Sequence, residues 1–196
     1  MKKFFTFGVC FAVLSSLYAG DQLEMWYQGS VVLRNQHVVV GNISVYQEHD
    51  LIVFRTDADT STTILPAYKI ESVFFYDSSA NINRKYISRV NQHASFPHYQ
   101  LFEVVLAGSI PVLRKQGVWS SDSEDAKCFN YYILYENDIL ELRKFRRLVY
   151  PHIVKQSKEI LMFVRREKLS PNKADSAVKI IRHYNLQGIH AALAVN

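Results

Sequence analysis

The stretch GSVVLRNQHVVVGNISVY, residues 29–46, holds two similar pieces, GSVVL and GNISV, which begin at Gly29 and Gly41. A phosphate-binding glycine loop needs several glycines close together, leading from a strand into a helix. Here each glycine is isolated in or beside a strand-like run, and no helical pattern follows. A glycine inside a strand usually marks a bend, a bulge or a close backbone approach. The stretch therefore predicts two neighbouring strands that bend at matching positions.

Further strand-like runs lie on both sides of this stretch. Runs rich in Val, Ile, Phe and Tyr predict strands at 26–33, 37–46, 50–56 and 73–76, after Pro97, and on both sides of turns at 107–109 and 136–138. Pro66 weakens a central strand, so the residues around it favour a short helical turn or an edge strand. The polar residues 78–96 are predicted to form a long excursion from the sheet.

The pattern changes to a helical one at residue 143. Apolar residues in 142–169 recur at three-four spacing, and Pro151 is predicted to break or restart this helix. A second helix is predicted to begin with Ser170 as its cap and Pro171 in its first turn. It is expected to end at 185–188, with His183 placed to interact with the helix dipole.

Strands first and helices last are typical of an α+β domain. We expect a curved, mainly antiparallel sheet of about seven or eight strands, followed by C-terminal helices packed on it. Residues 20–196 are predicted to form one domain, mainly β over 20–142 and mainly α over 143–196.

Residues 1–19 follow the three-part pattern of a secretory signal peptide. Lys2 and Lys3 are followed by an apolar run, and small residues lead to a cleavage site after Ala19. This run is shorter than the about 20 residues that span a bilayer; a retained N-terminal anchor is the alternative. No later segment predicts a transmembrane helix. The short, Lys-led signal is typical of bacteria, which predicts the periplasm, the outer-membrane periphery or secretion.

Charge is divided unevenly along the chain. Residues 20–140 hold 9 Lys and Arg against 14 Asp and Glu, whereas residues 141–196 hold 12 against 4. The net charges are therefore −5 and +8. This division predicts either that the two parts pack on each other or that a basic face meets an acidic partner.

The basic residues of the first helical segment are the strongest candidates for a contact surface. They are Arg143, Lys144, Arg146, Arg147, Lys155, Lys158, Arg165, Arg166 and Lys168. Such a set suits anionic lipid headgroups or an acidic protein face. The alternative is an ordinary solvated helix face. Nucleic acid is not expected to be the partner of an exported protein.

Motifs for catalysis or metal binding are weak. His93 and His98 lie in the polar middle and Glu103 follows in a predicted strand, but the spacing fits no standard zinc arrangement. No nucleophile elbow and no HExxH motif occur, and no cofactor is expected. Cys128, which lies in a strand-like run, is interpreted as a buried free thiol.

Four segments of the sequence are similar to those of a known group of proteins. They are GSVVL…GNISVY (29–46), YKIESVFFYD (68–77) followed by Arg84, YQLFEVVLAGSIPVLRK (99–115) and IIRHYN (180–185). Together they resemble uncharacterised exported proteins of Bacteroidetes-type bacteria, over most of the mature chain. The resemblance implies an envelope location and an α+β domain, and supplies no activity and no functional residues.

These observations predict an exported envelope protein that is a non-catalytic binding or structural module. Its contact surface would be the basic helical face, and its partner an envelope protein or an anionic membrane surface. Two alternatives stay open. One is a small hydrolase-type enzyme with a cleft around His93, His98 and Glu103; the other is a carrier of a small apolar ligand inside the curved sheet.

Overall fold

The computed structural model describes residues 25–56, 61–117 and 129–194. Within these residues the strands are β1 (Tyr27–Leu33), β2 (Val38–Tyr46), β3 (Leu51–Arg55), β4 (Thr63–Pro66), β5 (Ile70–Asp77), β6 (Ile82–Val90), β7 (Tyr99–Leu106), β8 (Val112–Gln116), β9 (Phe129–Tyr135) and β10 (Asp138–Glu141). The α-helices are α1 (Phe145–Leu148), α2 (Tyr150–Gln156), α3 (Lys158–Arg166) and α4 (Ala174–Ala194). Short 3₁₀ turns, η1 (Ala67–Lys69) and η2 (Leu142–Lys144), follow β4 and β10. The predicted signal peptide with its cleavage site after Ala19, and Cys128, lie outside the described residues.

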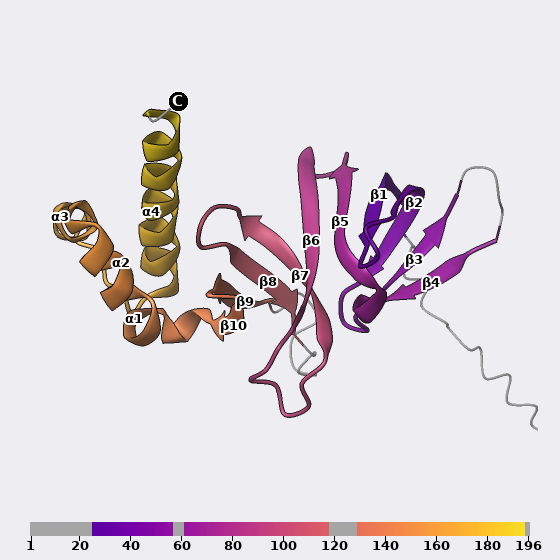
Figure 1. Ribbon diagram of the computed structural model, residues 1–196, viewed down its shortest axis with the longest axis horizontal. Helices are drawn as coiled ribbons and strands as arrows, with labels where there is room; N and C mark the ends of the chain where they lie inside the picture. Colours follow the sequence, from indigo (N-terminus) through magenta and orange to yellow (C-terminus); the bar gives the residue numbers. More distant parts are fainter. Residues whose placement is uncertain (1–24, 57–60, 118–128, 195–196) are drawn as a thin grey trace, which may run out of the picture.

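All of these strands form one antiparallel sheet in the order β10-β9-β8-β7-β6-β5-β1-β2-β3-β4. Figure 1 shows the sheet running from β4 at one end to β10 beside the helices. Strand β1 lies between β2 and β5, so the first of the described strands is inside the sheet and not at its edge. The predicted α+β class with an antiparallel sheet and C-terminal helices is confirmed, but the sheet has 10 strands within the described residues and not seven or eight.

The two glycines of the opening stretch face each other across the β1–β2 pair. A Cβ atom on Gly29 would lie 2.3 Å from the Phe74 carbonyl oxygen, and one on Gly41 would lie 2.4 Å from that of Arg55. Both oxygens belong to the backbone of the adjoining strands, so they cannot turn aside. The two strands are neighbours, as predicted, and close backbone approach explains the glycines.

Strand β6 corrects the prediction of a long excursion over 78–96. Its inward polar side chains have partners on other elements: Arg84 donates to Asp77 and Glu103, and the Ser88 hydroxyl donates to the Ala67 carbonyl at 2.6 Å. Because these groups are satisfied inside the protein, the strand does not need an apolar inward face. The sequence therefore shows no apolar alternation there, and the excursion is confined to the loop 91–98.

The inner side of the curved sheet is filled by apolar side chains. Val31, Ile43, Ile52, Val73 and Leu101, which come from five different strands, are completely buried in one cluster. This packing brings the β2–β3 end of the sheet close to β7. The apolar-ligand carrier therefore gains no support from this part of the interior.

The turn between β2 and β3 fixes this curvature by bonding to strands far away in the sheet. The Gln47 side chain donates to the carbonyls of Leu101 and Arg114 at 3.2 and 2.9 Å. Asp50 accepts a bond of 2.7 Å from the Leu101 amide and pairs with Lys115. This role depends on contacts with β7 and β8, so it could not be predicted from the residues around Asp50 in the sequence.

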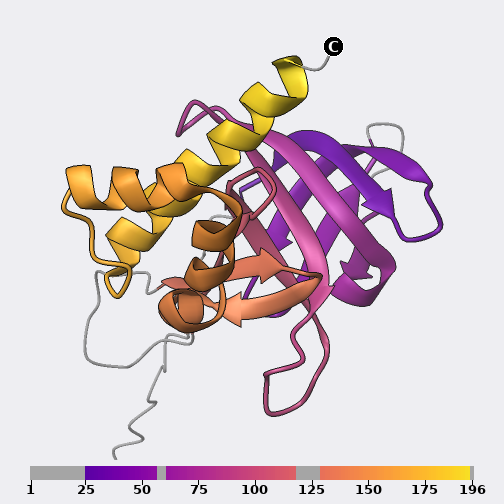
Figure 2. The same cartoon turned by 60° about the vertical axis from the view of Figure 1, so that its left-hand side comes forward.

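The helices cover one side of the β8–β10 end of the sheet (Figure 2). Their contact with the sheet is a single apolar cluster, which includes Val112 and Ile133 of the sheet and Phe145, Ile160 and Ile180 of the helical region. Each of these side chains is completely buried. The helical end is therefore part of the same folded body as the strands that it covers.

The predicted helix boundaries were partly wrong. Pro151 does restart the helix, as the second residue of α2. Helix α4, however, begins at Ala174, because the Lys173 amide bonds to the Ser170 carbonyl and closes a turn before it. The helix also runs past 185–188 to Ala194, so His183 is inside it and does not cap its end.

Asn185 does not end helix α4, because its side chain bonds to the β7–β8 turn and not to the backbone of the helix. It is buried, and its Oδ1 accepts a bond of 2.9 Å from the Ile110 amide. Its Nδ2 donates to the carbonyls of Ile110 and Ala107 at 3.0 and 3.3 Å. Gly108, whose φ is +142°, leaves space for this side chain, because a Cβ atom at residue 108 would lie 2.4 Å from it. One amide thus ties α4 to the β7–β8 turn.

Gly41→Ala should lower the free energy of unfolding by about 1–3 kcal/mol, because the new methyl group meets the Arg55 carbonyl. Urea unfolding of the variant measures this loss. Val40→Ala, at the neighbouring exposed position, is the control and should change the midpoint little. Equal midpoints for the two variants would contradict the close-approach explanation.

Asn185→Leu should lower the free energy of unfolding by about 3 kcal/mol, because the Ile110 amide and carbonyl would lose their partner in a buried site. Thermal and urea unfolding provide the measurement. Leu186→Asn, the opposite exchange at the next and exposed residue, should have little effect. A stable Asn185→Leu protein would show that α4 is held by apolar packing alone.

Candidate functional site

The structure places the predicted basic residues on the surface of the helical end. Lys144 is half-buried, and the rest of the set is exposed: Arg143, Arg146, Arg147, Lys155, Lys158, Arg165, Arg166 and Lys168. They come from η2, α1, α2 and α3 and from the turn after α3. The predicted exposure of these side chains is therefore seen, whereas their use as a contact surface stays a prediction.

The ion pairs of this segment are local among the described residues. Arg143 pairs with Glu141, Arg166 with Glu167, and Arg146 donates to the Asn172 side chain at 3.1 Å. None of the described acidic residues of β1–β9 pairs with the segment. Of the two explanations for the charge division, the described contacts therefore favour an outward basic face over mutual neutralisation.

Two large apolar side chains are exposed beside basic residues of the helical end. Met162 of α3 is 63% exposed and lies between Lys158 and Arg165 at four- and three-residue spacing, which places the three on one face of the helix. Leu186 of α4 is 49% exposed and lies one turn after Arg182. Exposed apolar residues between cations are typical of helices that lie on membrane surfaces.

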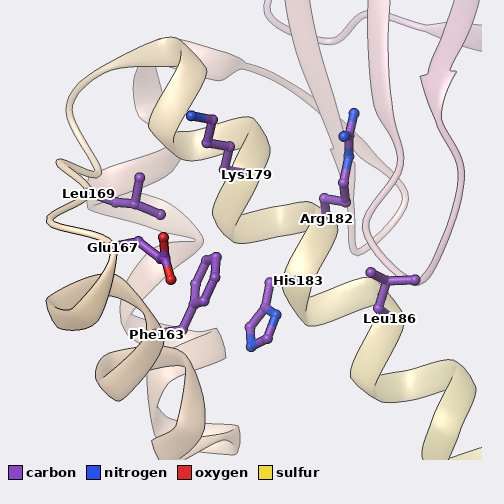
Figure 3. Close-up of a pocket in the computed structure, with 7 residues that line it drawn as sticks. All are labelled: Phe163, Glu167, Leu169, Lys179, Arg182, His183 and Leu186. Atoms are coloured by element: carbon purple, nitrogen blue, oxygen red, sulfur yellow. The ribbon is translucent and has the colours of Figure 1, made fainter.

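A groove runs between α3 and α4, with a cavity volume of about 260 Å³. Figure 3 shows its seven lining residues: Phe163, Glu167 and Leu169 on one side, and Lys179, Arg182, His183 and Leu186 from α4. Most of the surface that lines the groove is apolar, although four of the seven residues are polar or charged. The Phe163 and His183 rings stack in it, with their centroids 3.9 Å apart and their planes 13° apart.

Lys179 and Arg182 are functional candidates that the sequence analysis missed. Both are exposed, and neither forms an ion pair with another described residue. They follow each other at three-residue spacing on α4, and Leu186 continues the same row. That spacing was visible in the sequence. The pairing of this row with Phe163 was not, because it depends on how α4 packs on α3.

Polar bonds hold the two sides of the groove in place. Gln187 of α4 donates to Glu159 at 2.7 Å and accepts a bond of 3.1 Å from the Ser157 hydroxyl. Tyr184 donates to Gln156 at the end of α2. These bonds fix α4 against α2 and α3, whereas Asn185 fixes it against the sheet. The groove is therefore preformed.

The three residues of the hydrolase hypothesis have separate partners. His93 Nε2 lies 2.9 Å from Asp138, and His98 Nε2 lies 3.5 Å from Asp50. Glu103 accepts bonds from two arginines: Arg84 at 2.7 Å, and Arg114 at 2.7 and 3.0 Å. Both oxygens of this carboxylate are therefore occupied, which leaves no free general base at Glu103.

Glu103 is the centre of a buried charge network inside the sheet. Arg84 joins it to Asp77, with 2.7 Å between Arg84 Nε and Asp77 Oδ2. The side chains of Asp77 and Glu103 are 3% and 7% exposed. Burial, together with the Glu103 carboxylate, raises the pKa of the neighbouring Tyr86. The network is charge-balanced, and removing one member of such a set typically costs about 3–5 kcal/mol.

Neither a metal-binding cluster nor a membrane-spanning helix is found among the described residues. No group of three or more His, Cys, Asp and Glu side chains is arranged to hold a metal ion there. No helix in that part of the chain is both long and apolar enough to cross a membrane.

Asp77 should make stability depend on acid pH. A hydrogen bond from the Ser79 hydroxyl and the contact with Arg84 lower its pKa from 3.8 to about 2, although burial opposes this. The carboxylate therefore stabilises the folded state above pH about 4, and this contribution is lost as the pH falls from about 4 to about 2. Unfolding measured across that range should show a shallower acid loss for Asp77→Asn than for the wild type.

The matched control is Asp175→Asn, at an exposed position of α4. It should keep the wild-type slope. If Asp77→Asn and wild type lose stability in parallel below pH 4, the Ser79 and Arg84 contacts do not hold the carboxylate in its charged form.

Comparison with protein-family models, with curated proteins and with solved structures finds no match to this chain. The resemblance to exported proteins of Bacteroidetes-type bacteria therefore stays a prediction. The function has to be argued from the geometry of the helical end.

Proposed function

We propose that the chain is an exported cell-envelope protein, without catalytic activity, that docks on an anionic membrane surface through its basic helical end. The observation that carries this proposal is the set of exposed cations on α1–α3 around the exposed Met162. The predicted signal peptide supports the envelope location.

The physical argument combines two attractions. Each Lys or Arg near an anionic bilayer contributes about 1 kcal/mol, and exposed apolar side chains add to this when they enter the headgroup region. Arg147, Lys155, Lys158, Arg165 and Lys168 have no ion pair with a described residue, so no internal pair has to be broken on docking. These cations can therefore pair with lipid headgroups, which permits reversible attachment to the membrane surface.

An acidic envelope protein is the second candidate partner, because the same cations would meet its carboxylates. Met162 favours the membrane, since an apolar side chain between cations can enter a lipid layer. The binding of Glu103 by two arginines argues against the hydrolase hypothesis.

The purified mature chain should bind vesicles of phosphatidylglycerol mixed with phosphatidylcholine at low salt, and should be released at high salt because the attraction is screened. Arg147→Glu combined with Arg165→Glu should weaken binding at least tenfold, since two attractions become repulsions. Co-sedimentation measures the effect.

The control is Lys69→Glu combined with Lys85→Glu, which changes the net charge equally at exposed positions of η1 and β6, away from the helical end. It should retain most of the binding. Equal losses in both double variants would mean that net charge alone decides binding. In fractions of the native host, protein that is soluble at low as well as at high salt would contradict docking on a membrane.

A further inference from the structure

The groove between α3 and α4 has a composition that surface attachment does not explain. Docking needs exposed cations and exposed apolar side chains but no cavity, whereas this groove is preformed, with a volume of about 260 Å³ and two cations along α4. This volume is slightly below the roughly 300–1,000 Å³ of common small-molecule sites. It suits a narrow ligand or the end of a longer one.

The chemistry of the lining limits what such a ligand can be. Glu167 is paired with Arg166, and His183 stacks on Phe163 with its Nε2 3.4 Å from Gln187. Lys179 and Arg182 are the lining groups that have no partner among the described residues. A peptide backbone would need several hydrogen-bonding groups along its length. A hydrocarbon chain needs none.

We propose that this groove binds a single-chain fatty-acid carboxylate. The hydrocarbon chain lies along Phe163, Leu169 and Leu186, and the carboxylate meets Lys179 and Arg182. The apolar lining and the two free cations fit the two parts of such a molecule, by burial of its methylenes and by charge complementarity. The inference deepens the proposed function, on which it rests for the lipid environment, and it assigns a ligand to a site next to the docking face.

The test uses sodium dodecanoate below its micelle concentration, with binding to the mature chain followed by titration calorimetry. Saturable one-to-one binding is expected. In a series from octanoate to dodecanoate, affinity should rise by up to about fourfold per added methylene until the groove is filled. Dodecyltrimethylammonium, with the same chain and the opposite charge, should bind at least about tenfold more weakly.

Two pairs of variants locate the site. Leu186→Asp should abolish dodecanoate binding, whereas Met162→Asp, at an exposed apolar position that does not line the groove, should not. Lys179→Gln with Arg182→Gln should weaken dodecanoate binding about tenfold and leave dodecanol binding unchanged. Lys158→Gln with Arg165→Gln removes the same charge from α3 outside the groove. It should weaken vesicle binding and leave dodecanoate binding unchanged.

The outcomes separate the two proposals. Lack of saturable dodecanoate binding, or binding that Leu186→Asp does not reduce, would overturn the fatty-acid site, whatever the vesicles show. An acidic peptide that competes with dodecanoate and shows the same dependence on Lys179 and Arg182 would also overturn it. Loss of vesicle docking with dodecanoate binding intact would contradict the proposed function and leave the groove assignment standing.

Discussion

A buried carboxylate held by two arginines is the interaction on which the curved sheet depends. Glu103 accepts from Arg84 on β6 and from Arg114 on β8, and Arg84 continues to Asp77 on β5. Four adjacent strands thus direct charges to the same inner side, beside the apolar cluster. Such charges are tolerated inside a protein only when all are paired. The strands are therefore fixed in register by their charges as well as by their backbone bonds.

The helical end is held to this sheet at two levels. Apolar packing of Phe145, Ile160 and Ile180 on Val112 and Ile133 provides the contact area. Asn185 then specifies how far α4 is shifted along its axis, because its amide has to meet Ile110. The groove between α3 and α4 therefore keeps its shape without a ligand, which lowers the entropic cost of binding.

The sequence predicted the fold class, most strands and the exposed basic face, because hydrophobic periodicity and charge counts are local signals. It did not predict β6, whose inward Arg84 is satisfied by residues from β5 and β7. It did not predict the start of α4, where a turn at Ser170 precedes the helix, nor the role of Asn185, which looked like a helix end. The groove was missed for the same reason: Phe163 and Leu186 meet only through tertiary packing.

Strand β1 comes first in the chain and lies in the middle of the described sheet, between β2 and β5. The meanders β1–β4 and β5–β10 can each form from local pairings, because β1 and β2 are consecutive strands, but their union needs the distant β1–β5 pairing. Non-local pairing of this kind is slow. Until β1 pairs with β5, both of these strands present unpaired edges, to which another partly folded copy can add. The central position of the first described strand thus makes the time before β1 and β5 pair the period of greatest risk of aggregation.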